Sequence, residues 1–375
     1  MPEIHRLTLP TPFPVGQVNS YVLRPDGPGL GSLTLVDPGP NYPPAKEALV
    51  KGLEKLGLGL DRFETLFLTH PHVDHYGLAG EIASRSGARV VAHADAVPRL
   101  TGRISESSPG QLLVFGKILA RAGLPGEFLA SLLRQWAASD RLGAAVKVDV
   151  LPADGDTVEG GGVTWKIIHT PGHSPGSVCF HDEVGQRLIA GDHLLPHITS
   201  NAIMEFREVS PGAAPVDAAE TGPVDAAEAG PVDVAEAGPA TAAEPTRATA
   251  AEPARASVLI RERSLEIYIQ SLRRVEALDV GEVLPGHGAP FTGHRVLIAR
   301  RMRHYERRKS AIAAILGRLG PSPAFGVALA LFPDQGEPTG QFLALSEALG
   351  HLDLLEADGR VRRTETREVD LYSLV

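Results

Sequence analysis

Short apolar runs bounded by Gly and Pro recur along the first 290 residues and predict buried strands. These runs lie at 63–68, 90–93, 148–151, 163–168, 177–180, 187–190 and 283–284. Apolar positions at helical spacing predict helices at 110–119, 127–133, 295–319, 325–332 and 341–355. The pattern therefore predicts a mixed α/β region that is followed by a mainly helical segment. The helices between 100 and 142 interrupt the strands, and either lining a pocket or covering a sheet would explain their apolar residues.

An eight-residue repeat rich in Pro, Ala and acidic side chains occupies residues 214–257. It has almost no large apolar side chains, so it cannot bury enough surface to order itself. We predict a disordered acidic insertion at 210–257, and both a neutral repeat expansion and a regulatory role remain open.

The length of 375 residues fits one large domain and a smaller one, which we place at 1–290 and 291–375. The net charge is −9, but eight acidic residues and two arginines in 214–257 account for −6 of it. Charge therefore does not exclude a nucleic-acid partner. No apolar run is long enough for a membrane span, the N-terminus does not resemble a secretory signal, and the single Cys179 excludes an internal disulfide. We expect a cytoplasmic protein without a membrane partner.

Four side chains that can bind metals lie within six positions: His70, His72, Asp74 and His75. They follow the predicted strand at 63–68 and precede a predicted helix start at 77–80. Imidazole nitrogens and carboxylate oxygens suit Zn²⁺ and similar ions. In an extended loop His70 and His72 project to the same side, whereas Asp74 and His75 follow a turn and can face a second point. The motif therefore favours two metals over a set of surface histidines.

Further candidate ligands follow three other predicted strands, at places where Gly and Pro end the strand and let the backbone come close. These residues are His169 and His173, Asp192 and His193, and His287.

These motifs together resemble the metallo-β-lactamase superfamily, on its glyoxalase-II-like branch. The matching segments are THPHVDH (69–75), HTPGHSPGS (169–177), GDH (191–193) and PGHG (285–288). The resemblance implies a four-layer αβ/βα sandwich, in which two mixed sheets face each other with helices outside and a metal site at one edge.

The resemblance also implies the roles of individual residues. One metal would be held by His70, His72 and His173, the other by Asp74, His75 and His287, with Asp192 bridging both. We expect two Zn²⁺ ions, with Fe or Mn as alternatives, about 3.5–4 Å apart and sharing an attacking hydroxide. Asp74 is the expected catalytic residue, because it would also orient that hydroxide. Candidates for supporting positions behind the ligands are Asp37, His169 and His193.

Hydrolysis of a small acyl thioester or ester is the leading functional hypothesis. The alternative is cleavage of single-stranded RNA, because the predicted helix at 295–319 carries many basic residues and 325–362 resembles a winged-helix unit. These basic residues are Arg300, Arg301, Arg303, Arg307, Arg308 and Lys309. A non-catalytic binding module, a β-lactamase and a mono-iron sulfur dioxygenase are weaker alternatives.

A serine nucleophile is a competing interpretation, because residues 172–176 fit the pattern G-x-S-x-G around Ser174. That motif requires a helix after the serine. A strand is predicted at 177–180 instead, so we interpret Ser174 as a loop residue beside His173.

Overall fold

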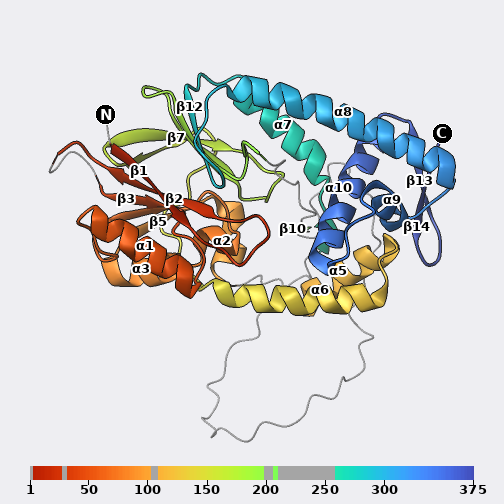
Figure 1. The fold of residues 1–375 in the computed structure, drawn as a ribbon, viewed down its shortest axis with the longest axis horizontal. Coiled ribbons are helices and arrows are strands. Elements are labelled where there is room, and N and C mark those ends of the chain that lie inside the picture. Colours follow the sequence, from red (N-terminus) through yellow and green to blue (C-terminus); the bar gives the residue numbers. More distant parts are fainter. Residues whose placement is uncertain (1–2, 28–31, 103–108, 198–205, 210–257) are drawn as a thin grey trace, which may run out of the picture. The chain divides into compact units, whose positions relative to one another are not determined.

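The computed structural model describes residues 3–27, 32–102, 109–197, 206–209 and 258–375 (Figure 1). The chain divides into two compact units, Met1–Glu205 with Arg263–Val375, and Phe206–Glu262. In the second unit β10 (Phe206–Val209) pairs antiparallel with β11 (Val258–Arg261). The acidic insertion predicted at 210–257 lies outside the described residues.

The first sheet has the strand order β1-β2-β3-β4-β5, antiparallel from β1 to β3 and parallel from β3 to β5. Its strands are β1 (Glu3–Leu9), β2 (Val18–Arg24), β3 (Thr34–Val36), β4 (Thr65–Phe67) and β5 (Arg89–Val91). Helices α1 (Pro43–Lys55) and α3 (Ala79–Ser86) cover one face, where Leu49, Leu53 and Ile82 share a core with Leu66. Shorter helices are α2 (Val73–Tyr76), the 3₁₀ turn Ala94–Ala96 and α4 (Val97–Leu100).

The second sheet has the order β12-β9-β8-β7-β6, in which only the β12–β9 pair is parallel. Its strands are β6 (Thr157–Gly160), β7 (Val163–His169), β8 (Val178–Asp182), β9 (Arg187–Gly191) and β12 (Glu282–Pro285). Helices α7 (Ser264–Glu276) and α8 (His294–Leu319) pack on its outer face, where Leu272 and Ile298 meet Leu188.

Side chains from both sheets form a third core between them. Strand alternation directs Leu66 toward the helices and Phe67 toward the other sheet. Phe67 stacks on Phe180 of β8, with ring centroids 4.6 Å apart, and the fully buried Trp165 of β7 joins the same core. The expected sandwich of two mixed sheets with outer helices is confirmed.

The inserted helices α5 (Pro109–Arg121) and α6 (Gly126–Ser139) pack against the C-terminal segment. Trp136 of α6 contacts Phe115 of α5 and Phe342 of α10, with ring centroids 4.5 and 5.0 Å away. A short 3₁₀ turn, Asp140–Leu142, follows α6. The described aromatic side chains of the insertion therefore pack on the C-terminal helices.

The C-terminal segment contains α9 (Ala324–Leu331), α10 (Pro338–Ala357), β13 (Val361–Glu365) and β14 (Asp370–Leu374). The two strands pair antiparallel as a hairpin. The order of helices and hairpin is the predicted one, and α8 matches the helix predicted at 295–319. The winged-helix assignment and the domain boundary at residue 290 stay predictions. No helix of the described residues is long and apolar enough to cross a membrane.

The strand predicted at 148–151 is wrong, because only Val150 forms a bridge there, to Val91. The carboxylate of Asp149 accepts the N–H of Val90 at 3.1 Å. That amide is therefore satisfied by a side chain instead of a continuous β-ladder.

Candidate metal centre

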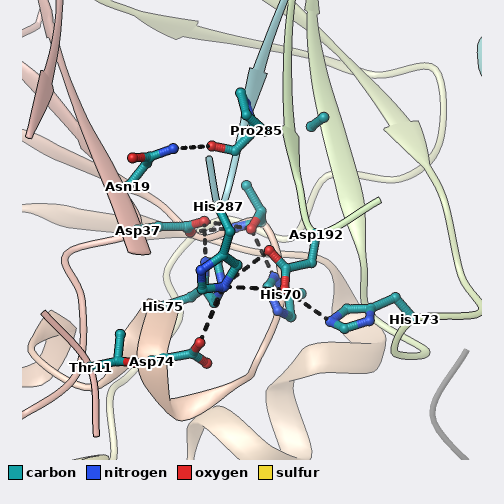
Figure 2. A network of polar contacts seen from close by, with 12 residues as sticks. Thr11, Asn19, Asp37, His70, Asp74, His75, His173, Asp192, Pro285 and His287 are labelled. Carbon is teal, nitrogen blue, oxygen red and sulfur yellow. Dashed lines mark hydrogen bonds and ion pairs between the residues drawn. The ribbon is translucent and has the colours of Figure 1, made fainter. Parts of the chain in front are cut away.

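Strand ends from both sheets bring the predicted site residues to one place (Figure 2). Parallel strands β3 and β4 end side by side, so Asp37 and His70, which follow them, lie at one edge. Parallel strands β9 and β12 likewise deliver Asp192 and His287. His173 lies in the loop between β7 and β8.

Two groups of ligand-type side chains form there. One nitrogen from each of His70, His72 and His173 lies within 4.8 Å of the others, and the ring centroids are 4.6–4.9 Å apart. Asp74, His75 and His287 form the second group under the same limit, and all three are buried. The structure therefore gathers each of the two ligand sets that the family resemblance implies.

The carboxylate of Asp192 lies between the two groups. Its Oδ1 is 3.3 Å from Nε2 of His75, and its Oδ2 is 3.6 Å from Nε2 of His173 and 3.5 Å from Nε2 of His287. Oδ2 of Asp74 lies 3.4 Å from the same nitrogen of His287. One carboxylate thus faces both groups at once.

Hydrogen bonds behind the rings fix which nitrogen points inward. Nδ1 of His75 donates to Oδ2 of Asp37 at 2.9 Å, and Nδ1 of His287 donates to the carbonyl of Gln17 at 2.7 Å. The hydroxyl of Thr69 donates to Asp37 at 2.6 Å, so its oxygen is left to accept Nδ1–H of His70 at 3.0 Å. Each of these histidines therefore directs Nε2 toward the centre.

These inward atoms fit metal ligands better than they fit one another. Nε2 of His70, His75 and His287 and Oδ1 of Asp192 are buried and make no hydrogen bond within the described chain. Nε2 of His75 and His287 lies 3.3–3.8 Å from carboxylate oxygens of Asp74 and Asp192, near the roughly 3.4 Å between ligands with bonds of about 2.1 Å at a tetrahedral angle. Buried polar atoms without partners are costly, so a set that converges in this way indicates a place for cations.

In the metal-free site, burial and neighbouring charges together shift the pKa values of the ligand-type side chains. Burial raises the pKa of Asp192, but His287 and His75 lower it, and the result lies well below the usual range. Burial lowers the pKa of His287, but Asp192 raises it, to about 10. At His70 burial and the neighbouring His75 both lower the pKa. Protons therefore occupy the second group at neutral pH, whereas the first group offers a neutral His70.

Close backbone approach explains why glycine flanks the ligands. A β-carbon at Gly286 would lie 2.3 Å from Oδ1 of Asp192, and one at Gly191 would lie 2.5 Å from Oγ1 of Thr69. Asp37 adopts a left-handed backbone with φ of 47°, which is uncommon for a residue other than glycine. Its carboxylate accepts three hydrogen bonds, two from Thr69 and one from His75.

Three supporting contacts have no role in the sequence-based prediction. Thr69 connects Asp37 to His70, and the side-chain amide of Asn19 donates to the carbonyls of Pro285 and Gly288 at 2.9 and 2.7 Å. The third contact uses the backbone carbonyl of Gln17, so it leaves no side-chain signal in the sequence. Asn19 therefore fixes the turn that carries His287.

The other two predicted supporting residues lie apart from the metal-facing atoms. His193 is buried with its ring 5.2 Å from that of Tyr268, and neither ring nitrogen has a hydrogen-bond partner among the described residues. His169 donates from Nε2 to the carbonyl of Pro175 at 2.8 Å and stacks on His93. Neither is in the two groups that face Asp192.

The basic residues of α8 that motivate the RNA alternative differ in their exposure. Arg301 is buried and donates to the carbonyl of Leu195, three residues beyond Asp192. Arg308 lies 2.9 Å from the carboxylate of Glu347, and Lys309 pairs with Glu306 and Asp358. Arg308 and Lys309 are paired in this way because α10 packs against α8. Arg303 and Arg307 remain exposed.

Comparisons with known proteins agree with this architecture. A family model described as the metallo-beta-lactamase superfamily matches residues 13–287. A probable metallo-hydrolase, YqjP of Bacillus subtilis, is 29% identical over 367 residues, which cover 95% of this chain and 93% of that protein. Hydroxyacylglutathione hydrolase GloC of Haemophilus influenzae is 28% identical over 160 residues, 43% of this chain and 60% of that protein. The crystal structure of the metallo-beta-lactamase family protein TTHA1429 from Thermus thermophilus superposes with a TM-score of 0.72 at 25% identity, covering 99% of this chain and 98% of that one.

Proposed function

The chain belongs to the metallo-β-lactamase superfamily, and from this premise we propose that it is a dinuclear-metal hydrolase of small acyl thioesters or esters. The observation that carries the proposal is the carboxylate of Asp192, which faces His173 of one group and His75 and His287 of the other. The similarity to a hydroxyacylglutathione hydrolase supports the thioester class.

Each ion would have its own set of protein ligands. His70, His72 and His173 would hold one Zn²⁺, and Asp74, His75 and His287 the other, with Asp192 shared. When bound, two such ions supply a polarised carbonyl and a water whose pKa falls to about 7. The hydrogen bonds from Nδ1 of His70, His75 and His287 hold these three rings in the orientation that this ligation requires.

Asp74 is suited to handle the attacking water. Burial raises its pKa, but His75 and His287 lower it, so that the carboxylate stays charged at neutral pH. A charged carboxylate in this position accepts a hydrogen bond from a water molecule and orients it.

Two described side chains near the site, Ser174 and Cys179, are poorly suited to act as nucleophiles. The Oγ of Ser174 lies 2.9 Å from that of Ser177, and the strand β8 follows in place of the helix that a serine elbow requires. Burial raises the pKa of the Cys179 thiol to about 12, which leaves almost no thiolate at neutral pH. Direct attack by water is therefore the mechanism that these residues support.

A substrate panel tests the proposal. The purified protein, loaded with Zn²⁺, is assayed against hydroxyacyl-glutathione, simple acyl thioesters and esters, a β-lactam and single-stranded RNA. We expect turnover of a thioester or ester that is unchanged, within about twofold, by Arg303→Glu and Arg307→Glu. RNA cleavage that these two exposed substitutions abolish, without thioester turnover, would replace the proposal with the nuclease alternative. One iron per chain with oxygen uptake would indicate a dioxygenase instead.

Asp37→Asn is expected to weaken metal binding by about 10–100-fold, the usual cost of losing an outer hydrogen-bond partner. Asparagine keeps one acceptor oxygen in place of two, so either the N–H of Thr69 at Oδ1 or the two donors at Oδ2, the Thr69 hydroxyl and Nδ1 of His75, lose their acceptor. Competition with a coloured chelator measures the affinity. The exposed Asp61→Asn serves as the control, and equal affinities for the two variants would contradict a supporting role for Asp37.

Metal binding at the second group is expected to strengthen as the pH rises from 7 toward 10. In the metal-free protein His287 has a pKa of about 10, so its proton must leave before Nε2 can bind a cation. One displaced proton corresponds to about tenfold in apparent affinity per pH unit below that pKa. Chelator competition at pH 7, 8 and 9 measures the slope, and a flat profile would show that His287 is not a ligand.

A further inference from the structure

A second cluster of ligand-type side chains lies one strand along from the centre. His93 and Asp95 follow β5, the parallel neighbour of β4, and His169 ends β7. One ligand atom from each of these three residues lies within 4.8 Å of the others. The two imidazoles stack with centroids 3.8 Å apart and planes 13° from parallel, and Oδ2 of Asp95 lies 3.6 Å from His93 and 3.9 Å from His169.

Tight packing of two chain segments creates this cluster. A β-carbon at Gly176 would lie 2.5 Å from the backbone nitrogen of Ala96, so the loop after β7 rests directly on the turn after β5. The N–H of His169 donates to Asp154 at 2.8 Å, and its carbonyl accepts from Arg274 at 2.9 Å. The backbone of His169 is therefore held on both sides.

The chemistry of the cluster suits a cation. The ion pairs of Asp95 within the described chain are with His93 and His169. Burial and the neighbouring His169 lower the pKa of His93, so that ring is neutral and keeps its lone pair at neutral pH. Two imidazoles and one carboxylate are a ligand set that borderline divalent metals prefer.

We propose that His93, Asp95 and His169 form a third, peripheral site for a divalent transition metal such as Zn²⁺ or Co²⁺. Three protein ligands leave a coordination position open to solvent or to an anionic ligand. The site is separate from the dinuclear centre, because it uses none of the seven residues of the two groups and Asp192.

The peripheral site binds more weakly than the buried groups. Nε2 of His169 already donates to Pro175, and Nδ1 of His93 accepts the N–H of Asp95 at 3.2 Å, so a cation replaces one or both contacts. The two rings stack nearly parallel, so at least one of them must rotate before nitrogens of both point at a single ion. Asp95 is also half exposed, which lowers the electrostatic attraction through solvent screening.

Equilibrium dialysis of the full chain against rising Zn²⁺, followed by metal analysis, tests the site. We expect one additional weaker equivalent in the wild type after the tight equivalents are filled. Asp95→Asn and His93→Gln should each lose this equivalent, or bind it at least about tenfold more weakly, with the tight equivalents unchanged. His5→Gln is the matched control, because it removes another imidazole that pairs with a carboxylate, that of Glu3.

Asp95→Asn keeps the test decisive if His93→Gln misfolds, since the Asp95 side chain is half exposed and circular dichroism checks each fold. Saturation of the wild type at the tight equivalents alone, or retention of the weaker one by a folded Asp95→Asn variant, overturns the proposal. Each variant is compared with the wild type by the number of metal ions bound beyond the tight equivalents. A failure of the dinuclear proposal would change the number of tight equivalents and would therefore be seen separately.

Discussion

Asp192→Asn is expected to lower kcat/KM by at least about 10³-fold and to reduce bound zinc from about two equivalents to about one. The carboxylate contributes one oxygen toward His75 and the other toward His173 and His287, so its loss removes a negatively charged side chain that faces both groups. Metal stabilisation of transition-state charge contributes several kcal/mol, and about 4 kcal/mol corresponds to about 10³ in rate. Steady-state kinetics on the best substrate of the panel and elemental analysis measure both effects.

Ser174→Ala is the matched control, because Ser174 lies next to His173 but its hydroxyl contacts Ser177. We expect its activity to stay within about threefold of wild type and its metal content to be unchanged. Two retained zinc ions and nearly normal turnover in Asp192→Asn would remove Asp192 from the ligand set. An inactive Ser174→Ala variant with full metal content would instead support the serine mechanism.

Phe180→Ala is expected to destabilise the fold by about 3–5 kcal/mol, the usual range for removing a buried aromatic ring. Phe180 is fully buried and stacks on Phe67 between the sheets, in the same core as Trp165. At about 2–4 °C per kcal/mol, the midpoint of thermal unfolding should fall by about 10 °C. Thermal unfolding followed by circular dichroism in the metal-free protein isolates this packing effect.

Val184→Ala provides the comparison, because Val184 is 94% exposed in the turn between β8 and β9. An exposed substitution of this kind changes stability by less than about 0.5 kcal/mol. Equal midpoints for Phe180→Ala and Val184→Ala would mean that the two sheets do not depend on this contact.

Local sequence pattern was sufficient for most of the strands and helices that position the centre. The runs at 163–168 and 187–190 became β7 and β9 within one residue, because Gly and Pro end these strands where the ligands begin. The same pattern failed at 148–151, where the carboxylate of Asp149 takes the amide of Val90. The periodicity of apolar residues cannot show that a side chain accepts a hydrogen bond from a backbone N–H.

The arginines of α8 show that charge has the same limit. The sequence shows that they are closely spaced, but Arg301 reaches Leu195 and Arg308 reaches Glu347, residues more than thirty positions away. Whether a charged side chain faces solvent depends on the element packed beside it. Single-sequence reasoning could not identify α10 as that element.

The sequence alone determined that ligand-type side chains follow the predicted strands, where Gly and Pro let the backbone come close, and the family resemblance of these motifs implies which seven of them gather. Only the tertiary structure decided how these side chains are presented. The Gln17 carbonyl selects the inward nitrogen of His287 from 270 residues away, Asp37 does the same for His75, and the stacking of His93 on His169 joins segments from different sheets. Such contacts depend on how distant strands pack, and local periodicity carries no record of that packing.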